Sequence, residues 1–443
     1  MMRKLVIFFT IVLTGAVASA QEAPAPAPPA TPVLTLREAL RTAAAYQPSL
    51  RQAHATSEVA GARSDEAMSP FLPSVTGNAS YKRSTANFAP SPGSSPTVAA
   101  NVQTSTRTFN YFSFGVSASQ LVWDFGRTLG QYDAAKATAQ SQREAERTTA
   151  AQVVLAVEAA FFAARAQKAL LAVATEALAN QDRHLRQTQG FVTAGTHPEI
   201  DLAQARTNRA NAVVQVVNSE NAFESAKAQL NQAMGVEGPT SYDVADEALP
   251  AVAGEDEATE AMLPEALQAR PEFAVMASQI RAQEAVVKAV FGNWFPTIGV
   301  STGLTDAGTE INHMAWNWNG LVSLSWPIVQ GGLQVFQTRE ARATLEVLKA
   351  QADTIRQQVR LDVEQARLGV RAAKAAIVAI KEAVTNAREQ LRLAEARYAT
   401  GVGNSIELSD AQYALTNAQG QQVQADFNLS SARAQLVKAL GRR

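Results

Sequence analysis

Length, composition and charge already exclude several classes of protein. The chain has 443 residues, of which 47% are hydrophobic, and this apolar fraction excludes disorder throughout. Its 39 basic and 40 acidic residues leave a net charge of −1 with no strongly basic segment, so no nucleic-acid partner is expected. The absence of cysteine excludes disulfides, thiolate metal ligands and a lipid anchor on an N-terminal cysteine. The length suits two or three ordinary domains.

The first 20 residues have the three-part design of a secretory signal peptide. Arg3 and Lys4 precede the apolar run Leu5–Val17, and the small residues at 18–20 (ASA) form the expected cleavage site. The alternative is a membrane anchor, but this run is too short to cross about 30 Å of hydrocarbon. Residues 21–33 alternate Ala and Pro, which favours an extended, semi-rigid tether. We therefore expect an exported protein.

The rest of the chain is expected to be a tandem repeat. Residues of the first half match residues of the second half at one ungapped offset of 206 positions. Matching pairs include Ser117 with Ser323, Gly126 with Gly332, Gly195 with Gly401, and Ala228 with Ala434. The sequence therefore predicts a first repeat over residues 34–235, an acidic connector over 236–262 and a second repeat over 263–443.

Each repeat is expected to contain a short helix, a β-hairpin, a long helix and a shorter helix. The second repeat predicts helices over 263–291, 333–398 and 405–440, and strands over 297–305 and 319–328. The long helix has coiled-coil periodicity, and its span of about 100 Å requires neighbouring helices to cover its apolar stripe. That stripe is Ala341, Leu345, Leu348, Ala352, Ile355, Val359, Val363, Ala366, Val370, Ala373, Ile377, Ile380, Val384, Ala387, Leu391, Ala394 and Tyr398.

The two hairpins, at about 74–123 and about 297–329, alternate apolar side chains with small polar ones. Val300 and Leu304, for example, share one face of a strand, while Ser301 and Gly303 share the other. A half-buried sheet of a soluble protein gives the same alternation. All five tryptophans lie in or beside these hairpins, as in the aromatic girdles of membrane barrels: Trp123, Trp294, Trp316, Trp318 and Trp326. This clustering favours membrane strands that face outer-membrane lipid.

Four strands cannot close a transmembrane barrel, because an open edge in lipid leaves backbone groups unpaired. Barrels in membranes start at eight strands. The chain is therefore expected to pool its strands with copies of itself. Two, three or more protomers satisfy this requirement equally, so the strands alone leave the number open.

Short motifs mark the junctions between the expected elements. They are LTLREAL at 34–40, FLP at 71–73, WDFG at 123–126, WFP at 294–296, VQGG at 329–332, RYATG at 397–401 and IELSDA at 406–411. Together they resemble the TolC-type outer-membrane efflux protein family, over nearly all of the mature chain.

This resemblance implies an α+β membrane protein, a homotrimer whose 12-stranded β-barrel joins a long α-helical coiled-coil barrel. It implies a passive exit duct of an efflux or type I secretion system, located in the outer membrane and extending into the periplasm. A periplasmic adaptor protein and an inner-membrane transporter are the implied partners. The connector 236–262 would correspond to the equatorial region, although a solvated linker is an equal alternative. Drugs, metals and proteins all stay open as substrates, and a non-conducting helical spacer of the envelope is the rival function.

The resemblance also implies candidate residues at the periplasmic tip. Glu407 and Asp410 match two acidic pore-constriction positions, and their spacing places both on one helix face. The alternative is that they are ordinary acids that oppose the dipole at a helix start. Tyr398 matches an aromatic gate position, although simple packing is an equal interpretation. Gly195 and Gly401 are expected to cap the two long helices.

Two further positions complete the tip. Asp201 marks the first repeat's tip, with an adaptor-facing or capping role. The family member compared has an arginine where this chain has Gly403, so a polar lock of the gate through that arginine is not expected here.

The sequence shows no phosphate loop, catalytic constellation or metal cluster, so we expect no enzyme activity, no cofactor and no bound metal.

Overall fold

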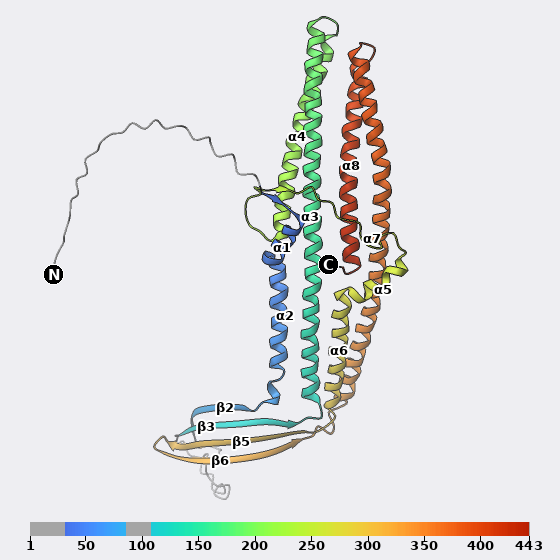
Figure 1. Cartoon of the computed structure of the whole chain (residues 1–443). Coiled ribbons are helices and arrows are strands. Elements are labelled where there is room, and N and C mark those ends of the chain that lie inside the picture. Colours follow the sequence, from blue (N-terminus) through green and yellow to red (C-terminus); the bar gives the residue numbers. More distant parts are fainter. Residues whose placement is uncertain (1–31, 86–107, 443) are drawn as a thin grey trace, which may run out of the picture.

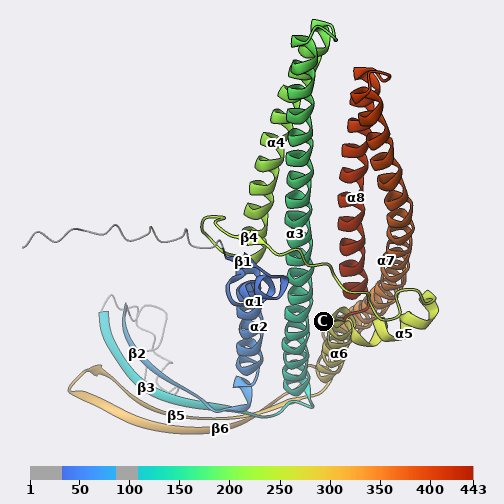
Figure 2. The ribbon, with the colours of Figure 1, turned by 45° about the horizontal axis from the view of Figure 1, so that its top comes forward.

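The computed structural model describes residues 32–85 and 108–442 as a long rod of helices that ends in a four-stranded sheet (Figure 1). The helices run side by side along the rod, and the strands curve away from one end of it (Figure 2). Two helix-to-helix turns form the opposite end, which we call the tip. The expected signal peptide and nearly all of the expected tether lie outside the described residues.

The first half of the described chain runs from α1 to α4, and the second half runs from α5 to α8 in the same order. The first half contains α1 Leu36–Tyr46, α2 Pro48–Glu66, the 3-10 helix η1 Ser69–Phe71, β2 Ser74–Thr85, β3 Thr108–Trp123, α3 Arg127–Thr193 and α4 Glu199–Met234. The second contains α5 Thr259–Ala269, α6 Pro271–Gly292, β5 Thr297–Glu310, β6 His313–Ser325, α7 Leu333–Ala399 and α8 Ser405–Ala439. Before α1, β1 Val33–Leu34 pairs in parallel with β4 Asp243–Val244, which lies between the two halves.

Two expected elements differ from the structure. The single helix expected over 263–291 is wrong, because α5 and α6 meet at Arg270, whose φ of −74° and ψ of 126° are extended. Pro271 causes this break, since its ring disfavours a helical residue before it and it has no N–H to donate. The strands expected over 297–305 and 319–328 have the wrong bounds, since β5 ends at Glu310 and β6 covers His313–Ser325. Polar residues inside both strands weaken their β-propensity, so the sequence pattern did not show how far each strand extends.

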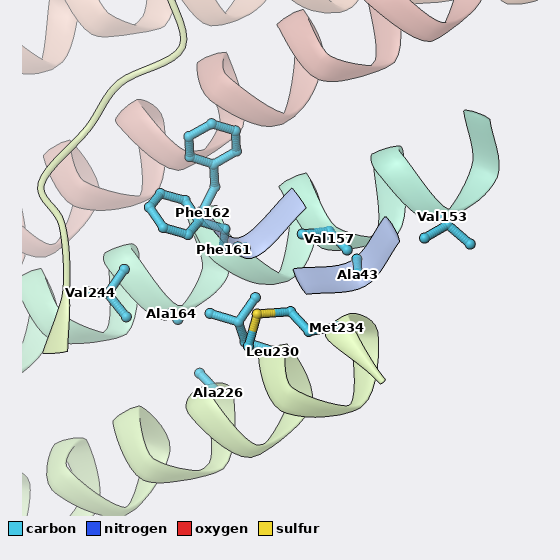
Figure 3. Packing of buried hydrophobic residues seen from close by; sticks show 11 residues of the cluster. Ala43, Val153, Val157, Phe161, Phe162, Ala164, Ala226, Leu230, Met234 and Val244 are labelled. Atoms are coloured by element: carbon cyan, nitrogen blue, oxygen red, sulfur yellow. The ribbon is translucent and has the colours of Figure 1, made fainter. Parts of the chain in front are cut away.

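The apolar stripe expected on the long second-half helix is confirmed. Every one of its positions in α7 is buried or half-buried, from Ala341 to Tyr398. The helix packs along α8, α6 and α5, and these contacts form two core clusters. The first half has a matching core, a buried cluster that includes Phe161 and Phe162 of α3 and Leu230 and Met234 of α4 (Figure 3).

Among the described residues, α3 alone contains a window apolar and long enough to cross a membrane, judged by composition and length. Several apolar residues of that helix, including Val153, Val157 and Phe161, are buried against α1 and α4. Packing within the rod therefore accounts for part of the apolar window, of which 39% is buried.

Glycines allow the shorter helices to abut end to end with the next ones. Gly235 follows α4 with φ of 73°, and a Cβ on it would lie 2.6 Å from the Cα of Gln47, just before α2. The Gln47 side chain donates to the last carbonyls of α4, at 2.8 Å for Ala233 O. Gly441 has φ of 71°, and a Cβ on it would lie 2.8 Å from the carbonyl carbon of Ala269. These contacts place α4 in line with α2, and α8 in line with α6 (Figure 1).

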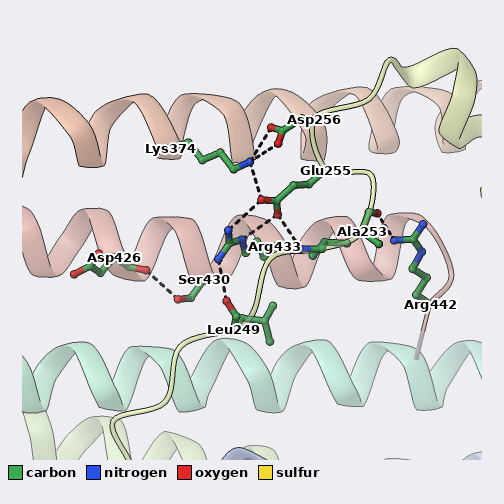
Figure 4. Close-up of polar contacts among 10 residues, drawn as sticks. Leu249, Ala253, Glu255, Asp256, Lys374, Asp426, Ser430, Arg433 and Arg442 are labelled. Carbon is green, nitrogen blue, oxygen red and sulfur yellow. Dashed lines mark hydrogen bonds and ion pairs between the residues drawn. The ribbon is translucent and has the colours of Figure 1, made fainter.

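Buried ion pairs hold part of the acidic connector against α7 and α8. Glu255 is only 6% exposed, accepts bidentate hydrogen bonds from Arg433 at 3.0 Å, and lies 2.7 Å from Lys374 Nζ (Figure 4). Burial alone would raise the pKa of Glu255, but the hydrogen bonds from Arg433 and Lys374 outweigh it and hold the pKa at about 2. A solvated linker is therefore wrong for this part of 236–262.

Candidate functional site

The four-stranded sheet has one apolar face and one polar face. Its order is β2-β3-β5-β6, all antiparallel. One row across the sheet is Gly77, Val116, Leu304 and Trp318, and the next row, which faces the opposite way, is Asn78, Gly115, Thr305 and Asn317. The alternation expected from single strands therefore continues in register across both hairpins. The polar exceptions on the apolar face include Arg83, Asn110, Gln120, Thr302 and Asp306.

Both outer strands of this sheet have a free edge. Within the described residues, β2 pairs only with β3, and β6 pairs only with β5. Each edge presents a row of backbone N–H and C=O groups that a further strand could pair with. The apolar side chains are also uncovered, since Val116, Leu304 and Val322 are all exposed. The sheet is therefore an incomplete unit, both at its edges and on its apolar face.

The five tryptophans fall at two levels of the sheet, and all of them are exposed. Trp123, Trp294 and Trp326 lie where strands meet helices, and Trp326 Nε1 donates to Trp294 O at 3.1 Å. A β-bulge after Leu121 shifts the register, so that Trp123 pairs with Ile298. This shift brings Trp123 onto the apolar face.

Trp316 and Trp318 form the second level, near the β5–β6 turn. Trp318 precedes Trp326 by eight residues, which is about 27 Å at about 3.4 Å per residue. This separation is close to the apolar band of about 25 Å on membrane barrels.

At the tip, Gly195 and Gly401 end α3 and α7 in the same way. Gly195 N–H donates to Val192 O, and Gly401 N–H donates to Tyr398 O, with φ values of 72° and 74°. The following residue in each turn donates back to the third-last helical carbonyl, which completes a Schellman motif. The expected capping role of both glycines is confirmed, and the motif fixes the direction in which α4 and α8 return.

Tyr398 lies at the centre of the packing between the two helical hairpins. Its side chain is 1% exposed, and its hydroxyl lies 3.3 Å from that of Thr188 in α3. The rings of His184, Phe191 and His197 surround it, at centroid distances of 5.2, 6.0 and 5.4 Å. Burial lowers the pKa of His184, and the nearby Asp201 carboxylate partly opposes this shift. Tyr398 is therefore a packed contact between α7 and α3.

Asp201 joins the two turns through hydrogen bonds. Its Oδ1 accepts a hydrogen bond from Ser405 Oγ at 3.1 Å, and its Oδ2 lies 3.2 Å from His197 Nδ1. Ser405 opens α8, whereas Asp201 belongs to the first turn of α4. Sequence reasoning missed the role of Ser405, because more than 200 residues separate it from its partner.

Glu407 and Asp410 have different surroundings, although both lie in the first turns of α8. Glu407 N–H donates to the capping side chain of Asn404 at 2.7 Å, and its carboxylate lies 3.5 Å from Arg397 Nη1 at the end of α7. Asp410 is exposed and has no ion-pair partner within the described part of the chain. Arg397 was missed as a site residue, although its position in the RYATG motif already placed it beside the tip.

Comparison with known proteins assigns the chain to a family. The family model described as "Outer membrane efflux protein" matches residues 39–236 and 262–442, so the chain belongs to the outer membrane efflux protein family. A toluene efflux pump outer membrane protein, TtgC of Pseudomonas putida, is 25% identical over 341 residues, which are 74% of this chain and 68% of TtgC. The family makes this chain an outer-membrane transport component, as expected.

Solved structures show the same fold. The CmeC outer membrane channel of Campylobacter jejuni superimposes with a TM-score of 0.79 and 16% identity, over 92% of this chain and 85% of CmeC. VceC, an outer membrane protein of Vibrio cholerae, gives a TM-score of 0.78 and 16% identity, over 92% of this chain and 96% of VceC. The rod and sheet are therefore the fold of outer-membrane channel proteins.

Proposed function

We propose that the protein is a passive exit duct in the outer membrane, through which an efflux or type I secretion system releases its substrates. The observation that carries this proposal is the two-faced sheet with two free edges at the end of a rod whose long helices span about 100 Å. The apolar face suits lipid, the polar face suits a water-filled lumen, and the two tryptophan levels suit the two membrane interfaces. The rod would then extend into the periplasm.

The free edges require further copies of the chain, because unpaired backbone groups in lipid each cost several kcal/mol. A homotrimer would supply twelve strands and continue the helices into a closed coiled-coil barrel. Such a trimer would also cover the exposed outer faces of α2 and α7. Trimeric assembly follows the family resemblance, since the sheet by itself requires only that copies combine.

The tip is the proposed gate. Tyr398 and Asp201 hold the two helical hairpins of one protomer together through packing and hydrogen bonds. A change in this packing, biased by a partner, would open the end of the rod. Glu407 and Asp410 would form a ring of six carboxylates in a trimer and favour cations.

The partners and the compartment follow from this role. TtgC and BepC carry the words "efflux" and "outer membrane" in their names, and this supports an energised transporter in the inner membrane and a periplasmic adaptor as partners of this chain. Residues 1–20 would direct export, and the barrel alone would hold the protein in the membrane, because the chain has no cysteine to carry a lipid.

Conductance in planar lipid bilayers tests this proposal. A duct gives discrete single-channel currents after the purified protein is inserted, whereas a structural spacer of the envelope gives none. Stable insertion of the protein into the bilayer without any current would favour the spacer.

A further inference from the structure

A cavity of about 840 Å³ lies at mid-rod, where α8 ends and α6 begins beside α3. Residues of α1, α3, α5, α6 and α8 line it, so both halves of the chain contribute to it. Its volume lies in the range of sites for drug-sized molecules. Much of its wall is apolar, from Leu40, Val154, Leu155, Pro271 and Val437.

Glu158 of α3 lines this cavity and has no visible partner. Its side chain belongs to a residue that is only 8% exposed, and it makes no hydrogen bond or ion pair with any described residue. Burial raises the pKa of Glu158 to about 7. A carboxylate largely removed from water is costly unless a positive charge or hydrogen-bond donors satisfy it.

Glu364, which corresponds to Glu158 at the offset of 206 residues, has the hydrogen-bond donors that Glu158 lacks. Glu364 of α7 accepts a hydrogen bond from Arg367 at 2.8 Å and another from Thr259. The hydrogen bond from Arg367 lowers the pKa of Glu364. The two glutamates therefore occupy corresponding positions on α3 and α7, but only Glu364 is neutralised by the chain itself.

Five basic and four acidic side chains line the cavity, and no basic one forms an ion pair with Glu158. Arg147 pairs with Glu144 at 2.8 Å, Arg270 with Asp362 at 3.0 Å, and Arg442 with Glu265 at 2.7 Å. Arg143 and Lys438 also line the cavity and have no ion-pair partner among the described residues, but neither lies within ion-pair distance of Glu158. Glu146, the remaining acid of the wall, lies 3.2 Å from His54 Nδ1.

A second carboxylate of the wall, on Glu272, also needs a donor. Its buried Oε2 has no hydrogen-bond donor among the described residues, and Arg270 Nε approaches it only to 3.8 Å. The cavity thus combines apolar walls with two carboxylates that lack donors.

We propose that this cavity binds a drug-sized organic cation, whose charged nitrogen is held by the Glu158 carboxylate. The apolar walls would pack against the body of such a ligand, and its N–H groups would satisfy the two carboxylates. An inorganic cation fits less well, because it needs several oxygen ligands, and no group of three acidic or histidine side chains among the described residues could hold one. The site is separate from the tip and from the sheet.

Fluorescence anisotropy of rhodamine 6G with the full-length protein in a non-ionic detergent tests this site. We expect saturable binding that Glu158→Gln weakens at least about tenfold, since the amide keeps the shape and loses the charge. The matched control, Glu364→Gln, should bind as the wild type does. Excess Mg²⁺ should not displace the dye. Equal affinity in the Glu158→Gln variant, or displacement by Mg²⁺, would overturn the proposal.

Two further measurements separate a loss of dye binding from a loss of folding or of channel activity. Glu158→Gln should unfold at the same or a higher temperature than the wild type, because a buried charge is removed. Dye affinity of the wild type should fall about tenfold from about pH 8 to about pH 6, as Glu158 takes up a proton. A pH-independent affinity would also contradict the site. Neither measurement requires conduction, so a failure here leaves the proposed duct untouched.

Discussion

Ser405 Oγ donates a hydrogen bond to Asp201 Oδ1 at 3.1 Å, and this contact joins the start of α8 to the start of α4 at the tip. The same carboxylate faces His197 Nδ1 on its other side. One aspartate therefore holds both helix-to-helix turns of the protomer. If the tip is the gate, this contact helps to keep it closed.

Replacing Asp201 should loosen the tip. Asp201→Ala removes hydrogen bonds to a charged group, which are worth about 1.5–3 kcal/mol, and should raise the resting single-channel conductance in planar bilayers. Glu199→Ala is the control, because Glu199 is an exposed acid in the same helical turn. An unchanged conductance in the Asp201→Ala channel would show that this contact does not hold the gate.

The acidic pair of α8 should control block of the channel by multivalent cations. Glu407→Ala combined with Asp410→Ala should abolish the block, because the carboxylates that attract the blocker are gone. Arg397→Ala should have the opposite effect, since Arg397 lies 3.5 Å from Glu407 and partly neutralises it. Single-channel recordings over a range of blocker concentrations measure both effects. Block that survives the double substitution would remove Glu407 and Asp410 from the constriction.

The junction of α4 with α2 should tolerate no side chain at Gly235. Gly235→Ala forces a positive φ on alanine, at about 1–3 kcal/mol, and places its Cβ against the backbone of Gln47. Gly195→Ala is a matched control, with φ of 72° but no atom within 4 Å of the added Cβ. Thermal unfolding followed by circular dichroism should therefore show a larger loss for Gly235→Ala. Equal losses would mean that the close approach of α4 and α2 contributes nothing.

The Glu255 network should make the connector sensitive to acid. Because the folded pKa of Glu255 is about 2 and its ordinary value is 4.5, its stabilisation is complete above pH 4.5 and is lost as the pH falls towards 2. Glu255→Gln should lower the unfolding temperature at neutral pH, since Arg433 and Lys374 lose a buried partner, at about 3 kcal/mol. The wild type and the variant should converge near pH 2. A constant difference from pH 7 to pH 2 would contradict this assignment.

Long periodic segments of this chain were predictable because their pattern is set by packing along one helix face. Every position of the α7 stripe is buried or half-buried, and the faces of the strands were assigned correctly. The break at Arg270 was missed because the apolar pattern runs across it, although Pro271 was the signal that could have revealed it. The length of β6 was missed because Asn317 and Asn319, on the polar face, weaken its β-propensity.

Contacts between distant segments could not be read from the sequence. The sequence left open whether Tyr398 belongs to a gate or simply packs, and it could not name the neighbours of this ring. Thr188 and His184 come from another helix, about 210 positions away. The Asp201 and Ser405 pair and the Glu255 network depend in the same way on how the two halves dock. Periodicity reports which face of a helix is buried and does not report which residue lies opposite.

Cysteine cross-linking between sheet edges tests most directly whether copies of the chain close one barrel. The natural chain has no cysteine, so Thr76→Cys in β2, combined with a cysteine at 321, 323 or 325 in β6, introduces the only thiols. Thr76→Cys with Ser117→Cys is the control, because these residues pair within one chain and should link without joining copies.

The account predicts that oxidation of at least one β2–β6 pair in outer membranes gives covalent species that stop at three copies of the chain. Links that stop at two copies, links that continue beyond three, or no links while the control pair forms would contradict a barrel closed by three protomers.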